Sequence, residues 1–234
     1  MMKSLIVVAM VAALGSQALA ADMAVKAPPA PPVTSPFWSG FYLGGYGGGV
    51  WESTNTTFNG GTQSVSSNPS GGVFGGLIGV NRQIDAWVFG VEGDGGINTA
   101  RQTINFLSLG TGLPESQQLK SNYDARIRAR GGYAFGQFML FVAGGVTFSD
   151  ERMTLAHTTT GQPPFTIRND LTGWNAGLGI DYAFTRNWIG RIEYIHDDFG
   201  KNTFGFTVPS AGQFTDRVTS THDDTVRAAI IYKF

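Results

Sequence analysis

The sequence predicts an all-β fold, namely an eight-stranded antiparallel transmembrane β-barrel with short periplasmic turns and long extracellular loops. Three observations support this prediction. Short and long connections alternate along the chain, aromatic side chains lie at the expected strand ends, and the chain closes on an apolar strand that ends in Phe234. Outer-membrane barrels combine these features, because aromatic girdles mark both lipid–water interfaces and the last strand pairs with the first.

The N-terminal segment has the pattern of a secretory signal. Residues 1–20 contain a basic start, an apolar run from Leu5 to Leu14 and a small-residue cleavage site. The run is too short for a spanning helix, so a cleaved signal peptide is expected. The proline-rich residues 21–36 predict a stiff periplasmic linker. Residues 37–234 are then expected to form one barrel domain.

Composition narrows the possible classes. The chain has no cysteine, so its fold must come from packing and backbone pairing rather than from disulfides. Its formal net charge of -1 gives no reason to expect a nucleic-acid partner. No apolar run after residue 20 is long enough for a transmembrane helix. Strands must therefore provide any membrane crossing.

The first four strands are expected at residues 38–51, 72–82, 87–94 and 120–133. The first is dense in glycine, and its sequence does not show which of its two faces points inward. The fourth has the clearest period-two alternation. Its apolar face holds Tyr123, Ala125, Ile127, Ala129 and Tyr133, and its charged face holds Asp124, Arg126, Arg128 and Arg130.

The last four strands are expected at residues 138–148, 174–184, 188–196 and 225–234. Apolar and aromatic side chains share one face of the sixth strand. The seventh and eighth strands also alternate. The apolar face of the eighth consists of Val226, Ala228, Ile230, Tyr232 and Phe234.

The connections between these strands differ in length in a regular way. Those after the second, fourth and sixth strands span a few residues. Those after the first, third, fifth and seventh are long and polar, covering residues 55–69, 99–118, 151–170 and 200–221. Short turns at one rim and long loops at the other are the outer-membrane pattern, and an even strand number places both ends in the periplasm.

A soluble up-and-down barrel that carries a ligand is the rival with the same strand count. Alternation alone does not say which face points inward. The uneven loops, the terminal Phe234 and the aromatic strand ends favour the membrane barrel. The expected periplasmic girdle is Trp38, Trp87, Tyr133, Tyr182, Phe184, Trp188, Tyr232 and Phe234, and the outer one includes Trp51 and Trp174.

Five segments together resemble the RopB-type outer-membrane proteins of alpha-proteobacteria, within the OmpA-like group of eight-stranded barrels. They are residues 38–49, 87–94, 126–133, 187–194 and 226–234. The resemblance implies an abundant, porin-family component of the Gram-negative cell outer membrane, with members linked to host contact or envelope integrity. No peptidoglycan-binding domain is seen after the barrel, so wall tethering by that route is not expected.

The charged faces predict a network inside the barrel. An eight-stranded barrel is just wide enough for side chains to fill, and buried charges there must be paired. We expect Glu92 to pair with Arg126 or Arg128, and Glu193 with Arg191 or Arg227. The full expected lumen network is Glu92, Asp94, Asp124, Arg126, Arg128, Arg130, Asp181, Arg191, Glu193 and Arg227.

Three functions remain open for such a barrel. A salt-bridged plug favours a structural role in the envelope, whereas rearranging pairs would give a narrow channel for small solutes. The long loops would suit a surface-binding or adhesion module. Enzymatic activity is not expected, because His157, Thr158, Thr159 and Ser149 form no recognisable catalytic arrangement.

No metal site and no cofactor are assigned from the sequence. His196 and His222 are weak metal candidates, because both fall at the outer rim beside aspartates. Lipid is the expected surroundings of the barrel. The resemblance also implies a periplasmic chaperone and the barrel-assembly machinery as partners, with the apolar face of residues 226–234 as the insertion signal. The oligomeric state stays open.

Overall fold

The computed structural model describes residues 37–58, 63–107, 114–157, 165–207 and 214–234. The expected signal peptide and linker lie outside these residues and stay predictions. No helix long and apolar enough to cross a membrane occurs among the described residues.

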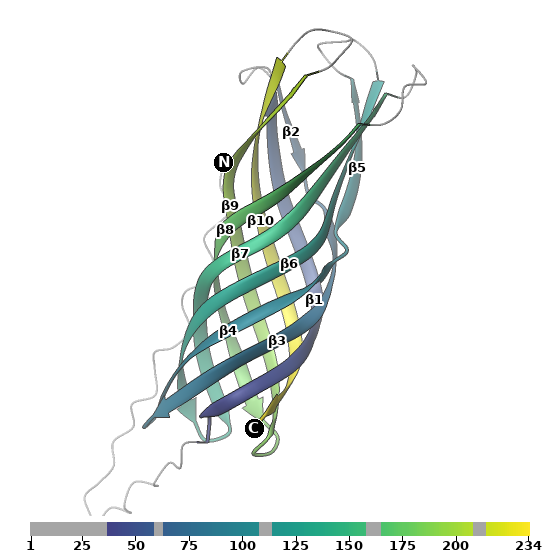
Figure 1. Cartoon of the computed structure of the whole chain (residues 1–234). Helices are drawn as coiled ribbons and strands as arrows, with labels where there is room; N and C mark the ends of the chain where they lie inside the picture. The colour runs from purple at the N-terminus through teal and green to yellow at the C-terminus, as the bar shows by residue number, and fades with distance from the viewer. Residues whose placement is uncertain (1–36, 59–62, 108–113, 158–164, 208–213) are drawn as a thin grey trace, which may run out of the picture. The chain divides into compact units, whose positions relative to one another are not determined.

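The described residues form one closed antiparallel barrel of eight strands (Figure 1). Two of the eight are interrupted by a bend: β2 with β3, and β4 with β5. The strands are β1 (Gly40–Phe58), β2 (Gln63–Ser67), β3 (Ser70–Ile84), β4 (Trp87–Asn98), β5 (Arg101–Leu107), β6 (Pro114–Phe135), β7 (Phe138–His157), β8 (Phe165–Ala183), β9 (Trp188–Thr207) and β10 (Phe214–Lys233).

Pairing of the first and last strands closes the barrel. β1 lies between β3 and β10, and its register with β10 runs from Tyr42 opposite Lys233 to Thr57 opposite Val218. At the C-terminus the backbone amide of Phe234 also donates to the carbonyl of Phe41 at 2.9 Å. The closure satisfies the backbone groups of both strands, as a lipid-exposed wall requires.

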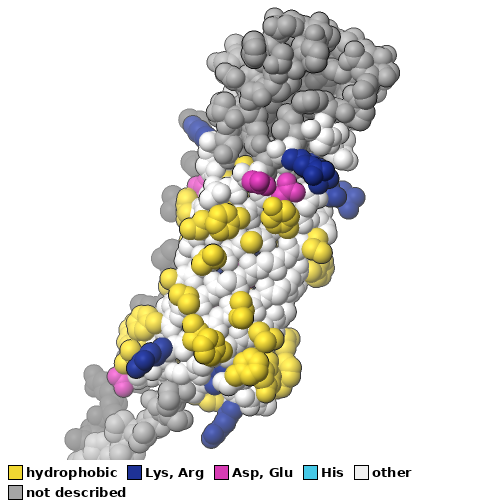
Figure 2. Space-filling model, in the orientation of Figure 1, with side chains coloured by type: hydrophobic (Ala, Val, Ile, Leu, Met, Phe, Trp, Pro, Cys, Tyr) yellow, Lys and Arg dark blue, Asp and Glu magenta, His cyan; other side chains and the backbone are white. Residues whose placement is uncertain are grey.

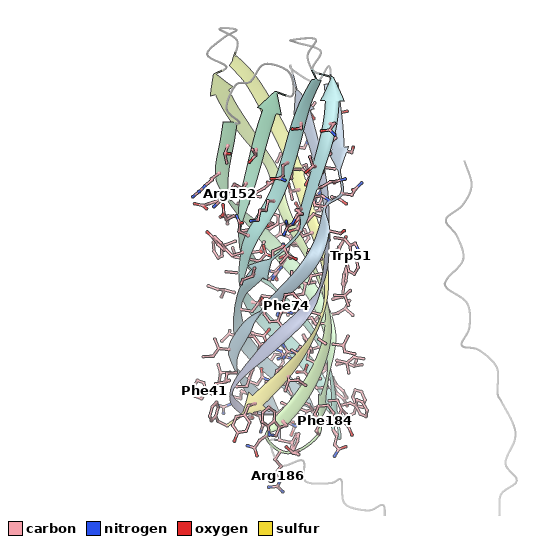
Figure 3. All side chains as sticks on the ribbon, turned by 90° about the vertical axis from the view of Figure 1, so that its right-hand side faces the viewer. Phe41, Trp51, Phe74, Arg152, Phe184 and Arg186 are labelled. Atoms are coloured by element: carbon pink, nitrogen blue, oxygen red, sulfur yellow. The ribbon has the colours of Figure 1, made fainter. Side chains whose placement is uncertain are left out.

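The orientation of the side chains agrees with a membrane barrel. Ile127 and Phe89 point outward and are 66% and 52% exposed, whereas Arg128 and Glu92 point inward and are 1% and 3% exposed. A soluble barrel would place these two sets the other way round. Figure 3 shows the outward side chains along the wall, including Phe41, Phe74 and Trp51.

Aromatic side chains ring the periplasmic end of the barrel. Trp188 and Phe234 both contact Tyr232, with ring centroids 5.2 Å apart in each pair. Trp38 departs from the expected girdle, because it is 1% exposed and packs inside the barrel end. Near the outer end the large outward side chains include Trp51, Tyr123, Phe148, Trp174 and Tyr194.

The predicted long loops were too long. β6 begins at Pro114, β7 continues to His157 and β9 to Thr207, so much of each polar stretch is paired strand. These extensions lie beyond the outer aromatic residues, where the described outward side chains are polar. Only a few apolar residues, such as Leu119, Leu171 and Phe199, are buried on the inward face, so the alternation that marks a strand in sequence is weak.

Candidate functional site: the barrel interior

Five arginines and five carboxylates form one ion-pair network in the middle of the barrel. Each of the ten side chains is at most 4% exposed, and every arginine contacts at least two carboxylates. The members come from β4, β6, β8, β9 and β10, whose alternation turns every second residue inward. They are Glu92, Asp94, Arg126, Arg128, Arg130, Asp181, Arg191, Glu193, Asp197 and Arg227.

Arg128 and Glu92 link the two sides of this network. Arg128 contacts Glu92 at 2.5 Å and Glu193 at 2.6 Å. Glu92 also contacts Arg191 at 2.6 Å, and Arg227 contacts Glu193 at 2.9 Å. The partners of Glu92 and Glu193 therefore include the expected Arg128 and Arg227.

Asp124 does not have the ion-pair role expected for it. Its carboxylate accepts hydrogen bonds from Asn98 at 3.0 Å and from Ser149 at 2.8 Å. Asp197 pairs with Arg126 instead, at 2.7 Å. Asp124 still points inward, as the alternation predicts, and the register of β6 shifts between Ser121 and Asp124.

Aromatic rings inside the barrel support the guanidinium groups, which the sequence pattern did not predict. The Arg130 guanidinium lies 4.0 Å from the ring centroid of Phe141, and that of Arg227 lies 4.2 Å from the centroid of Tyr46. The Tyr42 hydroxyl donates to Glu92 at 2.9 Å. These cation–π contacts strengthen a charge network removed from water.

Glycines of β3 make room for these rings. A Cβ at Gly79 would collide with the ring of Tyr42, and one at Gly75 with that of Tyr46. The spacing of tyrosines in the first strand against glycines in the second is a signal that could have predicted which face of the first strand points inward.

The interior is not polar throughout, which corrects the expectation of a purely polar plug. Met139, Phe141, Ile231 and Trp38 pack into one buried cluster. These residues fill the barrel on the periplasmic side of the charged network. Solute passing through would have to displace both layers.

Carboxylates collect inside the outer mouth of the barrel. Glu52 lies opposite Asp223, and Asp223 lies opposite Asp197, in direct cross-strand register. Glu52 and Asp223 lie beyond Trp51 and Val226, the last large apolar outward side chains described in β1 and β10, and so outside the membrane-spanning part. The aspartates 197 and 223, which the sequence placed at the rim beside the histidines, thus point inward and are buried.

The environment of this mouth changes the acidity of its carboxyl groups. Burial, together with the carboxylates of Asp124 and Glu151, raises the pKa of Glu52 to about 8. Burial raises the pKa of Glu151 to about 7. Burial and the neighbouring Glu52 raise the pKa of Asp223 well above its usual range. These groups hold protons at pH values where exposed carboxyl groups are ionised.

His196 and His222 meet on the outer surface of β9 and β10. Their rings stack with centroids 6.0 Å apart, and each contacts an aspartate: His196 contacts Asp224 at 2.8 Å and His222 contacts Asp198 at 3.3 Å. No group of three or more metal-ligating side chains is arranged to hold an ion in the described part of the chain.

The remaining sequence-based candidates are separated or lie outside the described residues. Ser149 donates its hydroxyl to Asp124 inside the barrel. The side chains of His157, Thr158 and Thr159 lie outside the described residues. The proposed insertion face points to the outer surface of β10, where Val226, Ile230 and Phe234 are exposed.

Comparison with known proteins identifies the family of this barrel. The model of the family described as "Outer membrane protein beta-barrel domain" matches residues 6–234. The chain belongs to this family. Since relatives that cover the whole chain are named outer-membrane proteins, it is an outer-membrane β-barrel protein embedded in the lipid of that membrane.

Two curated relatives from Brucella align with this chain over nearly the whole of both sequences. The 25 kDa outer-membrane immunogenic protein of Brucella canis is 30% identical over 238 residues, covering 100% of this chain and 99% of the relative. The 31 kDa outer-membrane immunogenic protein of Brucella melitensis is 30% identical over 257 residues and is covered completely.

Among solved structures, the outer membrane protease OmpT from Escherichia coli is similar with a TM-score of 0.53. The match covers 87% of this chain and 99% of that chain at 10% sequence identity. At this identity the likeness shows the barrel fold alone.

Proposed function

We propose that this protein is a structural barrel that contributes to the integrity of the outer membrane. The observation that supports it best is the filled interior. Ten charged side chains are paired across the lumen, and an apolar cluster lies on their periplasmic side. Removing one partner of a buried ion pair leaves an uncompensated charge, so such a network resists opening.

A narrow channel is the second candidate, because inward polar side chains continue from the mouth into the network. Glu52 accepts from Asn98, and Asn98 donates to Asp124, which lies on the same inward face as Arg126. Conduction by this route needs the ion pairs to exchange partners, as charged rings select ions in open channels.

Single-channel recording distinguishes the two candidates. Purified barrel in planar bilayers is expected to give small or infrequent conductance steps, and vesicles containing it are expected to retain small solutes. Steady, large openings in the wild-type protein would contradict the structural proposal and support the channel.

A contact role for the extracellular segments is compatible with the structural role and needs its own test. Cells that lack the protein would be complemented with a barrel in which residues 108–113 and 208–213 are replaced by glycine–serine turns. The structural proposal predicts restored resistance to detergent. Loss of that resistance with a correctly inserted barrel would contradict the proposal that the barrel alone supports envelope integrity.

Assembly partners belong to the same proposal. The outward apolar face of β10 ends at the exposed Phe234. Before folding, alternating apolar strands are prone to aggregate, so a holding chaperone and the barrel-assembly machinery are the proposed partners.

A further inference from the structure

Four cationic side chains form a row across the outer surface of β5 to β8. In the strand register Arg101 lies opposite Lys120, Lys120 opposite Arg152, and Arg152 opposite Arg168. Arg101, Lys120 and Arg168 are exposed and Arg152 is half-buried. Buried neighbours such as Ala100 and Leu119 take the inward positions beside them, so the row faces outward.

Such a row is unfavourable without an anion. Like charges directly opposite each other on neighbouring strands repel, because their Cβ atoms lie only about 5 Å apart. None of the four makes an ion pair with another side chain in the described ranges, and the Nε of Arg152 is buried there without a hydrogen-bond partner.

The nearest acids on this face compensate the row only in part. Asp150 and Asp170 lie opposite each other, one outward position closer to the membrane than Arg152 and Arg168. Asp150 accepts a hydrogen bond from Asn122 at 3.0 Å. Four cations against two acids leave two positive charges for a ligand from outside the chain.

The height of the row matches the lipid headgroups. Lys120, Arg152 and Arg168 come three, four and six residues beyond the outward Tyr123, Phe148 and Trp174 of their strands. At about 3.4 Å per residue and a tilt of about 45°, this puts the row about 7 to 14 Å above the aromatic band. Long Lys and Arg side chains can reach back toward the interface. In Figure 2, basic side chains lie above the hydrophobic band, beside acidic ones, and Figure 3 shows Arg152 on the outer wall.

We propose that Arg101, Lys120, Arg152 and Arg168 bind the phosphate groups of a lipid headgroup in the outer leaflet. Guanidinium groups hold phosphate through paired hydrogen bonds, and an ammonium adds a compact charge. Four neighbouring strands span about 15 Å, which suits a headgroup with more than one phosphate. The row lies on the side wall next to lipid, which favours a lipid over a soluble polyanion.

Native mass spectrometry of the folded full-length mature protein in detergent tests this proposal. The probes are bisphosphorylated lipid A, the same lipid after removal of its phosphates, inorganic pyrophosphate and dextran sulfate. The variant pair Lys120→Gln/Arg168→Gln is compared with the control pair Arg82→Gln/Arg186→Gln. The control removes the same charge from exposed positions near the periplasmic turns.

The wild-type protein is expected to bind the bisphosphorylated lipid more tightly than the dephosphorylated one. The row variant should weaken this binding by at least about tenfold, since each basic residue near an anionic surface adds about 1 kcal/mol. The control pair should bind as the wild type does, and excess pyrophosphate should not displace the lipid. A circular dichroism spectrum of each variant verifies that the barrel is folded.

Three results would overturn the proposal. One is equal binding of the lipid with and without phosphates, and another is an unchanged affinity in the folded row variant. The third is row-dependent binding of dextran sulfate or pyrophosphate with no preference for the phosphorylated lipid, which would assign the row to a soluble anion.

Discussion

Arg128 contacts three of the five carboxylates of the buried network. Its guanidinium contacts Glu92 on β4 and Glu193 on β9, and it lies 3.4 Å from Asp94. The side chain is fully buried. Its positive charge therefore compensates carboxylates that come from opposite sides of the lumen and have no access to bulk water.

Replacing Arg128 with Met is expected to destabilise the folded barrel by about 3–5 kcal/mol, because it leaves buried carboxylates without their cation. Urea unfolding in detergent micelles, followed by tryptophan fluorescence, measures the change. Arg82→Met is the control, since Arg82 is exposed. Equal stability of the two variants would show that the network adds nothing to folding.

The carboxyl groups of the outer mouth predict a pH effect. Glu52 has a pKa of about 8 in the folded protein, against 4.5 as its ordinary value. The folded state then binds more protons than the unfolded state between these values, so stability is expected to fall as pH rises from about 4.5 to about 8.

Glu52→Gln should flatten this pH dependence and raise stability at pH 8, as measured by urea unfolding at pH 5 and pH 8. Asp85→Asn is the control, because Asp85 is exposed in a turn at the other end. A wild-type barrel that is more stable at pH 8 than at pH 5 would contradict the role assigned to this mouth.

At the residue scale, inward side chains were predictable where the alternation is regular. Glu92, Arg128 and Arg227 could be placed on the inward face, because apolar residues clearly mark the opposite face of their strands. Asp197 could not, because His196, Asp197 and Asp198 are all polar and do not show which of them points inward. Contacts across the lumen join strands that are not neighbours, so alternation cannot assign them.

β10 closes the barrel, and Phe234 follows its last residue. A substitution of Phe234 can test whether this side chain is recognised during insertion separately from its contribution to closure. Phe234 and Phe41 are 67% and 68% exposed on the outer surface at the same rim. The backbone amide of Phe234 donates to the carbonyl of Phe41. A side-chain truncation at either position removes a similar lipid contact.

Phe234→Ala is therefore expected to slow insertion several-fold in vesicles that contain the barrel-assembly machinery, whereas Phe41→Ala should insert at nearly the wild-type rate. The readout is the fraction of protein protected from added protease over time. Equal rates for both variants would mean that the C-terminal aromatic side chain is not read as a signal.

At the scale of elements, the positions of the strands were predictable and their outer ends were not. The starts of β4, β7 and β9 at Trp87, Phe138 and Trp188 follow from aromatic residues beside tight turns. In the turn before β7, Gly136 has a φ of 66°, which favours glycine. The described outer ends of the strands carry no outward apolar face, so the sequence periodicity weakens where lipid contact ends.

The described barrel is one closed unit, because each of its eight strands pairs with two neighbours. A folded barrel of this kind is expected to remain intact in cold sodium dodecyl sulfate and to migrate differently on a gel before and after boiling. Because the sequence has no cysteine, added thiol should leave both bands unchanged. Identical migration before and after boiling would indicate that the closed barrel is not the stable state.

The class of the whole molecule was predictable because lipid imposes strong rules on a strand that it touches. Apolar side chains must point outward, aromatic residues gather at both interfaces, and no edge can stay open. The filling of the lumen was less predictable. The apolar cluster around Met139 and Ile231 uses the same residue types as the lipid face, so composition does not distinguish inside from outside there.

The continuation of the strands beyond Trp174 and Phe148 has a consequence for what other molecules meet at the cell surface. From Phe148 to the end of β7 at His157 the tilted wall rises by about 20 Å. The hydrogen-bonded outer ends of the strands thus lie well above the bilayer surface. A foreign epitope grafted between Leu107 and Pro114 would be attached to these outer strand ends, where an antibody could reach it on intact cells.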